Sequence, residues 1–157
     1  MKDKIQVDQQ YFYERLEQYL KDRHPHLAPV KSFIDMRSRR ALKTYRQNIL
    51  DGLPPLSAKA RADEVLYSSL IFSRFDTLRC ILATEYPDIP SDKQRSIALE
   101  MEVQFENIFR KYKLDDNLIQ RREYNHLIAE LITAIDVYFS QTSLYIRYCG
   151  RSRTNKE

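Results

Sequence analysis

Apolar side chains recur at spacings of three and four residues along most of this 157-residue chain. Such a period places them on one face of an α-helix, because the helix completes a turn every 3.6 residues. The two longest stripes are Ile97, Met101, Phe105, Ile108, Phe109 and Tyr112, and then Tyr124, Leu127, Ile128, Leu131, Ile135, Tyr138 and Phe139. The spacing predicts a five-turn helix from Ser91 to about Tyr112 and a last long helix after residues 114–117.

Four further segments show the same period, and stop residues separate them. The first ends before Pro25. The second runs from about Lys31 to Leu50, and its apolar stripe is Ile34, Ala41, Leu42, Tyr45 and Ile49. It is expected to end at Gly52, because glycine adopts the left-handed cap conformation without a Cβ clash. Prolines at positions 54 and 55 predict a turn, after which Ser57 is expected to cap the third helix.

The stretch IFSRFDTL, residues 71–78, interrupts an apolar run with polar side chains. Ser73 begins an S-x-x-D pattern, in which the serine hydroxyl accepts the amide proton of Asp76 at the start of a helix. This predicts a fourth helix that has Phe75, Leu78 and Leu82 on its buried face and that Pro87 stops. A similar S-x-x-Q pattern from Ser91 to Gln94 predicts the start of the fifth helix, and Asp115-Asp116 is expected to cap the last helix or to neutralise its positive end.

Glycine is scarce, with 2 residues in the whole chain, and β architectures need more turn-forming residues. Together with the six helical segments, this predicts an all-α fold, a single-domain bundle of about six helices with short connections. We expect the bundle domain over residues 1–143, followed by a basic C-terminal tail over residues 144–157.

No segment predicts export or membrane insertion. The start, MKDKIQVDQQ, has no apolar stretch after its charges. The most apolar segment, LIAELITAIDVYF, contains Glu130 and Asp136 and is shorter than the roughly 18 residues that a membrane span requires. Cys80 and Cys149 are too few for a disulfide framework. We therefore expect a cytoplasmic protein without membrane contact.

The net charge of +4 is unevenly distributed. Residues 31–46 contain six basic side chains and one acidic side chain. Residues 144–157 contain four basic side chains and one acidic side chain. Arg39, Lys43 and Arg46 fall within about 60° of one another on a helical wheel, away from the apolar stripe. Because a row of cations can follow a phosphate backbone, these three are candidate nucleic-acid-binding residues. The alternative is a solvated helix face.

The tail adds a second basic element, in which Tyr145 and Tyr148 alternate with arginines. Aromatic rings beside cations are typical of proteins that bind single strands by stacking. Basic tails also occur without a specific ligand. The candidate nucleic-acid-binding residues of the tail are Arg147, Arg151 and Arg153.

Other polar patterns do not complete a reactive site. Glu123 and His126 form a single E-x-x-H motif and are expected to face water, whereas di-iron bundles need two such motifs. His24 and His26 lack a third ligand nearby. Cys80 has no histidine base in the neighbouring sequence. We therefore predict no catalytic residue, no metal ligand and no bound cofactor.

Three stretches resemble an uncharacterised family of small helical proteins from gut- and mouth-dwelling anaerobic bacteria. They are FSRFDTL at residues 72–78, YKLDD at 112–116 and EYNHLIAEL at 123–131, in the order in which that family has them. The resemblance covers residues 11–141 and departs at Arg122, where the family has proline, and in the basic tail. Its members carry no assigned activity and are often encoded near mobile elements, so the resemblance implies a helical protein, favours DNA handling and supplies no catalytic residue.

Two hypotheses about function follow. The first is a non-enzymatic helical interaction module that binds another protein or a second copy of the chain. The alternative is a nucleic-acid-binding accessory protein of a mobile element, which contacts phosphates through Arg39, Lys43, Arg46 and the tail. An enzyme ranks third, since its residues would have to converge from distant positions. DNA binding that strengthens as salt falls distinguishes the second hypothesis from the first.

Overall fold

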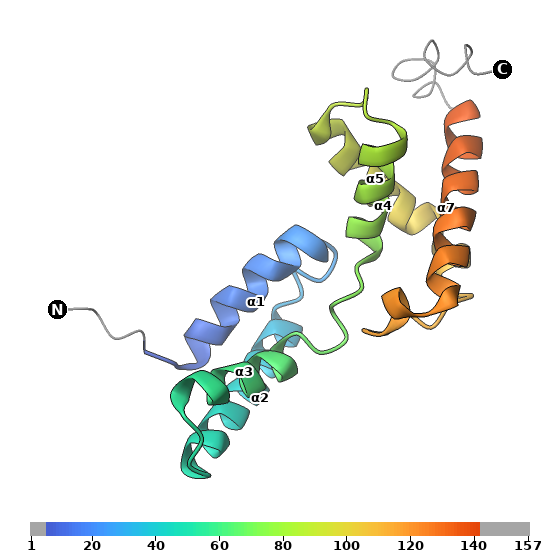
Figure 1. Cartoon of the computed structure of the whole chain (residues 1–157). Coiled ribbons are helices and arrows are strands. Elements are labelled where there is room, and N and C mark those ends of the chain that lie inside the picture. The colour runs from blue at the N-terminus through green and yellow to red at the C-terminus, as the bar shows by residue number, and fades with distance from the viewer. Residues whose placement is uncertain (1–5, 142–157) are drawn as a thin grey trace. The chain divides into compact units, whose positions relative to one another are not determined.

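The structure, a computed structural model, describes residues 6–141 and consists of helices. The α-helices are α1 (Gln9–Arg23), α2 (Lys31–Leu50), α3 (Pro55–Leu66), α4 (Arg74–Glu85), α5 (Ser91–Gln104), α6 (Glu106–Phe109) and α7 (Arg122–Ser140), and the 3-10 helix η1 spans Leu118–Gln120 (Figure 1). Residues 6–141 contain no strand, so the predicted all-α class is confirmed. The division between a domain over 1–143 and a tail over 144–157 stays a prediction, because the tail lies outside this range.

The helices gather into two compact units, and the division falls between Ile71 and Phe72. The N-terminal unit contains α1 to α3, and the C-terminal unit contains α4 to α7. Each unit has its own cluster of buried side chains. Across residues 6–141, no helix is both long enough and apolar enough to span a bilayer.

In the N-terminal unit, α2 packs against both α1 and α3. The helical spacing of apolar residues brings one stripe from each helix into a common core, and the buried members are Phe12, Leu16, Leu20, Ile34, Ala41, Ala62, Leu66 and Leu70. Beside this core, Arg15 of α1 donates to both carboxylate oxygens of Asp63 of α3, at 2.7 and 3.1 Å. The ion pair therefore joins the first and third helices directly.

In the C-terminal unit, α4 packs against α5, and α7 contacts α6 and η1. The fully buried residues of α7 repeat every four positions, at Leu127, Leu131, Ile135 and Phe139. This confirms the apolar stripe that the sequence predicts for the last helix. The predicted buried face of α4 is also confirmed, since Phe75, Leu78 and Leu82 are fully buried.

One of the three predicted serine caps is correct. The Ser73 hydroxyl oxygen accepts a hydrogen bond from the amide of Asp76 at 2.9 Å, and α4 begins at the next residue. The predictions for Ser57 and Ser91 are wrong, because α3 starts at Pro55 and α5 at Ser91 itself, without a side-chain cap. The reason is the preceding proline: Pro54 and Pro90 have φ angles of −59° and −57° and lead the chain into each helix without a hydroxyl.

The prediction of one five-turn helix after Ser91 is also wrong, because the helix is divided at Phe105. The Phe105 amide still bonds to the carbonyl of Met101 at 2.8 Å, but its own ψ is 19°, and α6 starts at Glu106. Phe105 and Phe109 both remain in the core of the unit. The apolar stripe therefore continues across the break, and no glycine or proline marks the place in the sequence.

Candidate interaction surface

The outward side of α2 is rich in cations, and the one acid of the helix, Asp35, comes before Met36. From Met36 to Leu50 the sequence has no Asp or Glu. The cations that are exposed on this stretch fall within about 120° of the helix circumference, since successive residues are about 100° apart. They are Arg39, Arg40, Lys43 and Arg46, which together form the basic face of α2.

Two arginines of α2 are held by other groups. Arg39 is 69% exposed, and its Nε lies 3.1 Å from Oδ2 of Asp35, one turn earlier. Arg37 points inward instead, where Nη1 donates to the carbonyl of Ser68 at 2.6 Å and the guanidinium covers the Phe33 ring. Because the last carbonyls of a helix carry partial negative charge, Arg37 stabilises the end of α3 and is not available to a ligand.

Arg40, Lys43 and Arg46 have no such partners. Within residues 6–141, none of the three forms an ion pair. Successive members are three residues apart on the helix, a spacing at which like charges repel one another. The predicted candidates Arg39, Lys43 and Arg46 are thus all exposed on one face, but their nucleic-acid role stays a prediction. The predicted set lacks Arg40, which lies about 60° from Lys43, on the side away from Arg39 and Arg46, and completes the face.

An apolar corner lies at the C-terminal end of the basic face, where α2 turns into α3. It consists of Ile49, Leu50 and Leu56. Leu50 is 80% exposed and Leu56 is 81% exposed, on opposite sides of the turn. Single surface leucines are ordinary, but three exposed large apolar residues around one turn make this corner a candidate interaction site. The sequence stripe had assigned Ile49 to the buried side, whereas 37% of it is exposed.

The backbone of this corner is firmly held. Gly52 has a φ of +91°, its amide bonds to the carbonyl of Ile49 at 3.1 Å, and the Leu53 amide bonds to the carbonyl of Asn48 at 3.0 Å. These two bonds form a Schellman motif, which confirms Gly52 as the stop of α2. Pro54 and Pro55 follow and restrict the chain further. Leu50 and Leu56 therefore project from a backbone with little freedom.

The other polar residues that the sequence singled out lie either at the surface or within the packing of a unit. Glu123 and His126 are exposed, as predicted. His24 is only 7% exposed, and its Nε2 lies 2.8 Å from the carbonyl oxygen of Leu70. Cys80 is exposed. Among residues 6–141, no three or more His, Cys, Asp and Glu side chains are grouped so that they could hold a metal.

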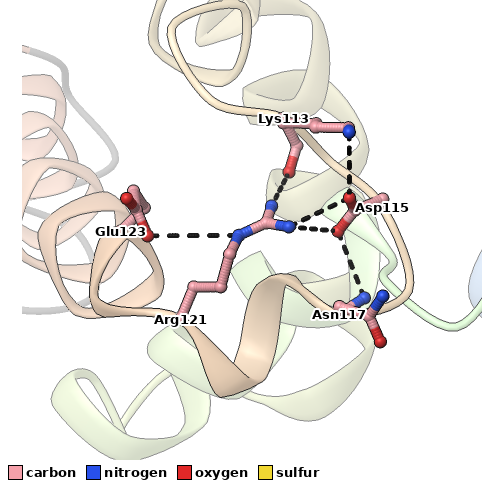
Figure 2. Close-up of polar contacts among 5 residues, drawn as sticks. All are labelled: Lys113, Asp115, Asn117, Arg121 and Glu123. Atoms are coloured by element: carbon pink, nitrogen blue, oxygen red, sulfur yellow. Dashed lines mark hydrogen bonds and ion pairs between the residues drawn. The ribbon is translucent and has the colours of Figure 1, made fainter.

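Asp115 binds Arg121, which directly precedes the first residue of α7 (Figure 2). Its carboxylate lies 2.8 Å from Nη1 of Arg121, whose Nη2 donates to the carbonyl of Lys113 at 2.7 Å. The hydrogen bond from Arg121 lowers the pKa of Asp115, and the backbone amide of Asn117, 3.1 Å away, adds to this effect. The prediction that Asp115 caps the last helix is wrong, because no side chain caps α7. Asp115 binds the Arg121 guanidinium instead.

A second polar contact joins the segment after α6 to α7. The Tyr112 hydroxyl donates to Oε1 of Glu130 at 2.5 Å, and Nζ of Lys111 lies 2.9 Å from Oε2. The hydrogen bond to the carboxylate raises the pKa of Tyr112 to about 12 and lowers the pKa of Glu130. The stretches YKLDD and EYNHLIAEL are therefore linked by contacts that position α7.

The tail candidates Arg147, Arg151 and Arg153 lie outside the described residues. Their role in nucleic-acid binding stays a prediction.

Comparison with known proteins places the chain among relatives of similar size and fold. Its fold is similar to the crystal structure of protein PG0816 from Porphyromonas gingivalis, with a TM-score of 0.75 and 32% identity over 84% of this chain and 91% of that chain. A search of curated proteins finds no match. Residues 4–144 match the model of the family described as a domain of unknown function, DUF1896. This confirms the resemblance to an uncharacterised family, and the chain belongs to the DUF1896 family.

Proposed function

We propose that the chain is a non-enzymatic interaction module that binds a protein partner through the apolar corner of its N-terminal unit. The observation that carries the proposal is the exposure of Leu50 and Leu56 on a backbone that the Schellman motif and two prolines restrain. Burying one leucine side chain contributes roughly 1.5–3 kcal/mol. A restrained turn loses little conformational entropy when it binds, so more of that energy appears as affinity.

The chemistry of the corner favours a protein as its partner. Aliphatic anchors bind where a pocket of apolar side chains receives them, and such a pocket is a feature of protein surfaces. Arginines are enriched around such contacts, and Arg46 precedes Leu50 by one helical turn. A second copy of the chain is one such protein. We place the partner in the cytoplasm, where a reducing environment maintains exposed thiols such as Cys80.

Site-specific photo-crosslinking in the cells that produce the chain tests this proposal. A photoreactive residue replaces Leu50, and a control replaces Val103, which is 75% exposed in the C-terminal unit. The protein crosslinked from position 50 is identified, purified and titrated calorimetrically against the whole chain. Sedimentation velocity tests whether the partner is a second copy.

We expect the double variant Leu50→Gln, Leu56→Gln to lose at least about a hundredfold in affinity, because two apolar side chains leave their pockets and each tenfold in affinity corresponds to about 1.4 kcal/mol. The control Leu99→Gln, Val103→Gln removes exposed apolar groups elsewhere and should bind as the wild type does. The proposal fails if position 50 crosslinks no more than position 103, or if the corner variant binds its partner unchanged.

A further inference from the structure

We propose that the basic face of α2 binds the phosphate backbone of double-stranded nucleic acid. This inference goes beyond the proposed protein contact, since it uses Arg39, Arg40, Lys43 and Arg46 and needs neither Leu50 nor Leu56.

The first argument is the unusual charge pattern of α2. Ordinary solvated helices carry compensating pairs, as in α1, where Nζ of Lys21 lies 3.7 Å from Oε1 of Glu17 one turn away. In α2 one such pair, Asp35 with Arg39, precedes a stretch from Met36 to Leu50 that has five basic residues and no acidic one. Arg37 is used inside the fold, but the repulsion among the exposed cations brings no structural benefit. An anionic ligand would relieve it.

The distribution of charge over the molecule supports the same conclusion. The described residues of the N-terminal unit include 11 basic and 8 acidic side chains, and those of the C-terminal unit include 9 and 12. Positive charge therefore belongs to the unit that contains α2. Two copies of the basic face would repel each other, so the ligand of this face is a polyanion and not the same surface of a second copy.

The spacing along α2 suits a phosphate backbone. Arg39 and Arg46 are seven residues apart, which corresponds to about 10 Å along the helix axis. One strand of a duplex carries a phosphate about every 3.4 Å of the duplex axis, so four cations on a helix that lies along this axis face about three phosphates. Three of the four are arginines, whose planar guanidinium groups bind phosphate oxygens in pairs.

A duplex fits this face better than a single strand. Binding of single strands relies on exposed aromatic rings on which bases stack. The aromatic residues of α2, Phe33 and Tyr45, are half-buried and pack against the core. The basic face thus offers cations without a stacking platform, which favours sequence-independent contact with the backbone.

Fluorescence anisotropy with a labelled 20-base-pair DNA duplex and the whole chain tests the proposal between 50 and 200 mM NaCl. A labelled oligo-dT strand and an acidic peptide of equal charge serve as competing ligands. The test variant is Arg40→Gln, Lys43→Gln, Arg46→Gln. A control with the same change in net charge is Lys93→Gln, Arg110→Gln, Arg122→Gln, all exposed in the C-terminal unit. A second control is Arg147→Gln, Arg151→Gln, Arg153→Gln.

Contact with about three phosphates predicts that the duplex affinity of the wild type falls about fortyfold over this salt range. In the α2 variant the slope of log affinity against log salt should shrink by about 2.7, one unit of about 0.9 for each lost contact. In both controls the slope should differ from that of the wild type by less than about 0.9, the contribution of one contact. Melting followed by circular dichroism should show the α2 variant folded, since its substitutions relieve repulsion.

The proposal is overturned if the wild type does not bind the duplex at 50 mM NaCl, or if the α2 variant and the C-terminal-unit control lose affinity equally. Tighter binding of oligo-dT or of the acidic peptide, or loss of binding in the tail variant alone, also overturns it. The corner variant Leu50→Gln, Leu56→Gln should bind the duplex normally. Failure of the protein contact is thereby distinguished from failure of the phosphate contact.

Discussion

Ser73 illustrates how one hydroxyl group determines where a helix begins. The same S-x-x-[DQ] spacing occurs at Ser73 and at Ser91, but only Ser73 accepts a hydrogen bond from the amide three residues later. At Ser91 the preceding Pro90 already supplies a helical φ. The Gln94 side chain is used elsewhere, since its Nε2 donates to the carbonyl of Ile89 at 3.0 Å. At this position the proline, and not the S-x-x-Q motif, therefore marks the start of the helix.

Replacing Ser73 by alanine should lower the free energy of unfolding by about 1 kcal/mol, because the Asp76 amide loses its acceptor. Ser91→Ala is the matched control, since the Ser91 hydroxyl caps nothing, and we expect a change within about 0.5 kcal/mol. Urea denaturation measures both. Equal losses in the two variants would contradict the cap assignment at Ser73.

Different faces of one helix make different contacts, and α2 is the clearest case. Its inner stripe, with Ile34 and Ala41, is fully buried against α1 and α3. Arg37 lies beside that stripe and binds the end of α3, while the basic face points to solvent. A substitution on one face should therefore leave the others intact, which makes α2 suitable for charge-removal experiments.

The start of α7 should depend on pH through Asp115. The folded chain lowers the pKa of this carboxyl chiefly through the hydrogen bond from Arg121. A lowered folded pKa stabilises the fold above the ordinary value of 3.8, and this stabilisation disappears as the pH falls through the folded pKa. We expect Asp115→Asn to lose less stability than the wild type when urea midpoints are compared between pH 6 and pH 3.

Arg121→Gln should show the same reduced pH dependence, and the double variant Asp115→Asn, Arg121→Gln should add little to either single change. This non-additivity is expected because both substitutions remove one interaction. Independent, additive effects would show that Arg121 is not the main cause of the lowered pKa of Asp115.

At the scale of the molecule, residues 6–141 contain two apolar cores, one on each side of the division between Ile71 and Phe72. FSRFDTL spans the beginning of the second core, with Phe72 and Phe75 buried in it and Ser73 starting α4. The polar interruption of this apolar run thus coincides with the start of a new packing unit.

Substitutions in the two cores should act locally. Leu16→Ala leaves a cavity in the N-terminal core and should cost about 2–5 kcal/mol. Hydrogen exchange measured by mass spectrometry should then accelerate in α1 to α3 more than in α4 to α7, and Leu131→Ala should show the reverse pattern. Equal acceleration in both units would mean that the two cores unfold as one.

The sequence by itself determined the all-α class, the extent of α2 and the buried faces of α4 and α7, because helical period and stop residues are local properties. It also placed Arg39, Lys43 and Arg46 on one exposed face. The exposure of the corner leucines was not predictable, since it depends on which helices cover the α2–α3 turn.

Only the tertiary structure decided which features of the pattern are used inside the fold. Arg37 and Arg40 look alike in sequence, but Arg37 meets a carbonyl 31 positions away, at Ser68, while Arg40 stays without a carboxylate among residues 6–141. The break at Phe105 and the division into two cores were decided in the same way. The physical reason is that these outcomes arise from contacts between residues far apart in the chain, which no local spacing records.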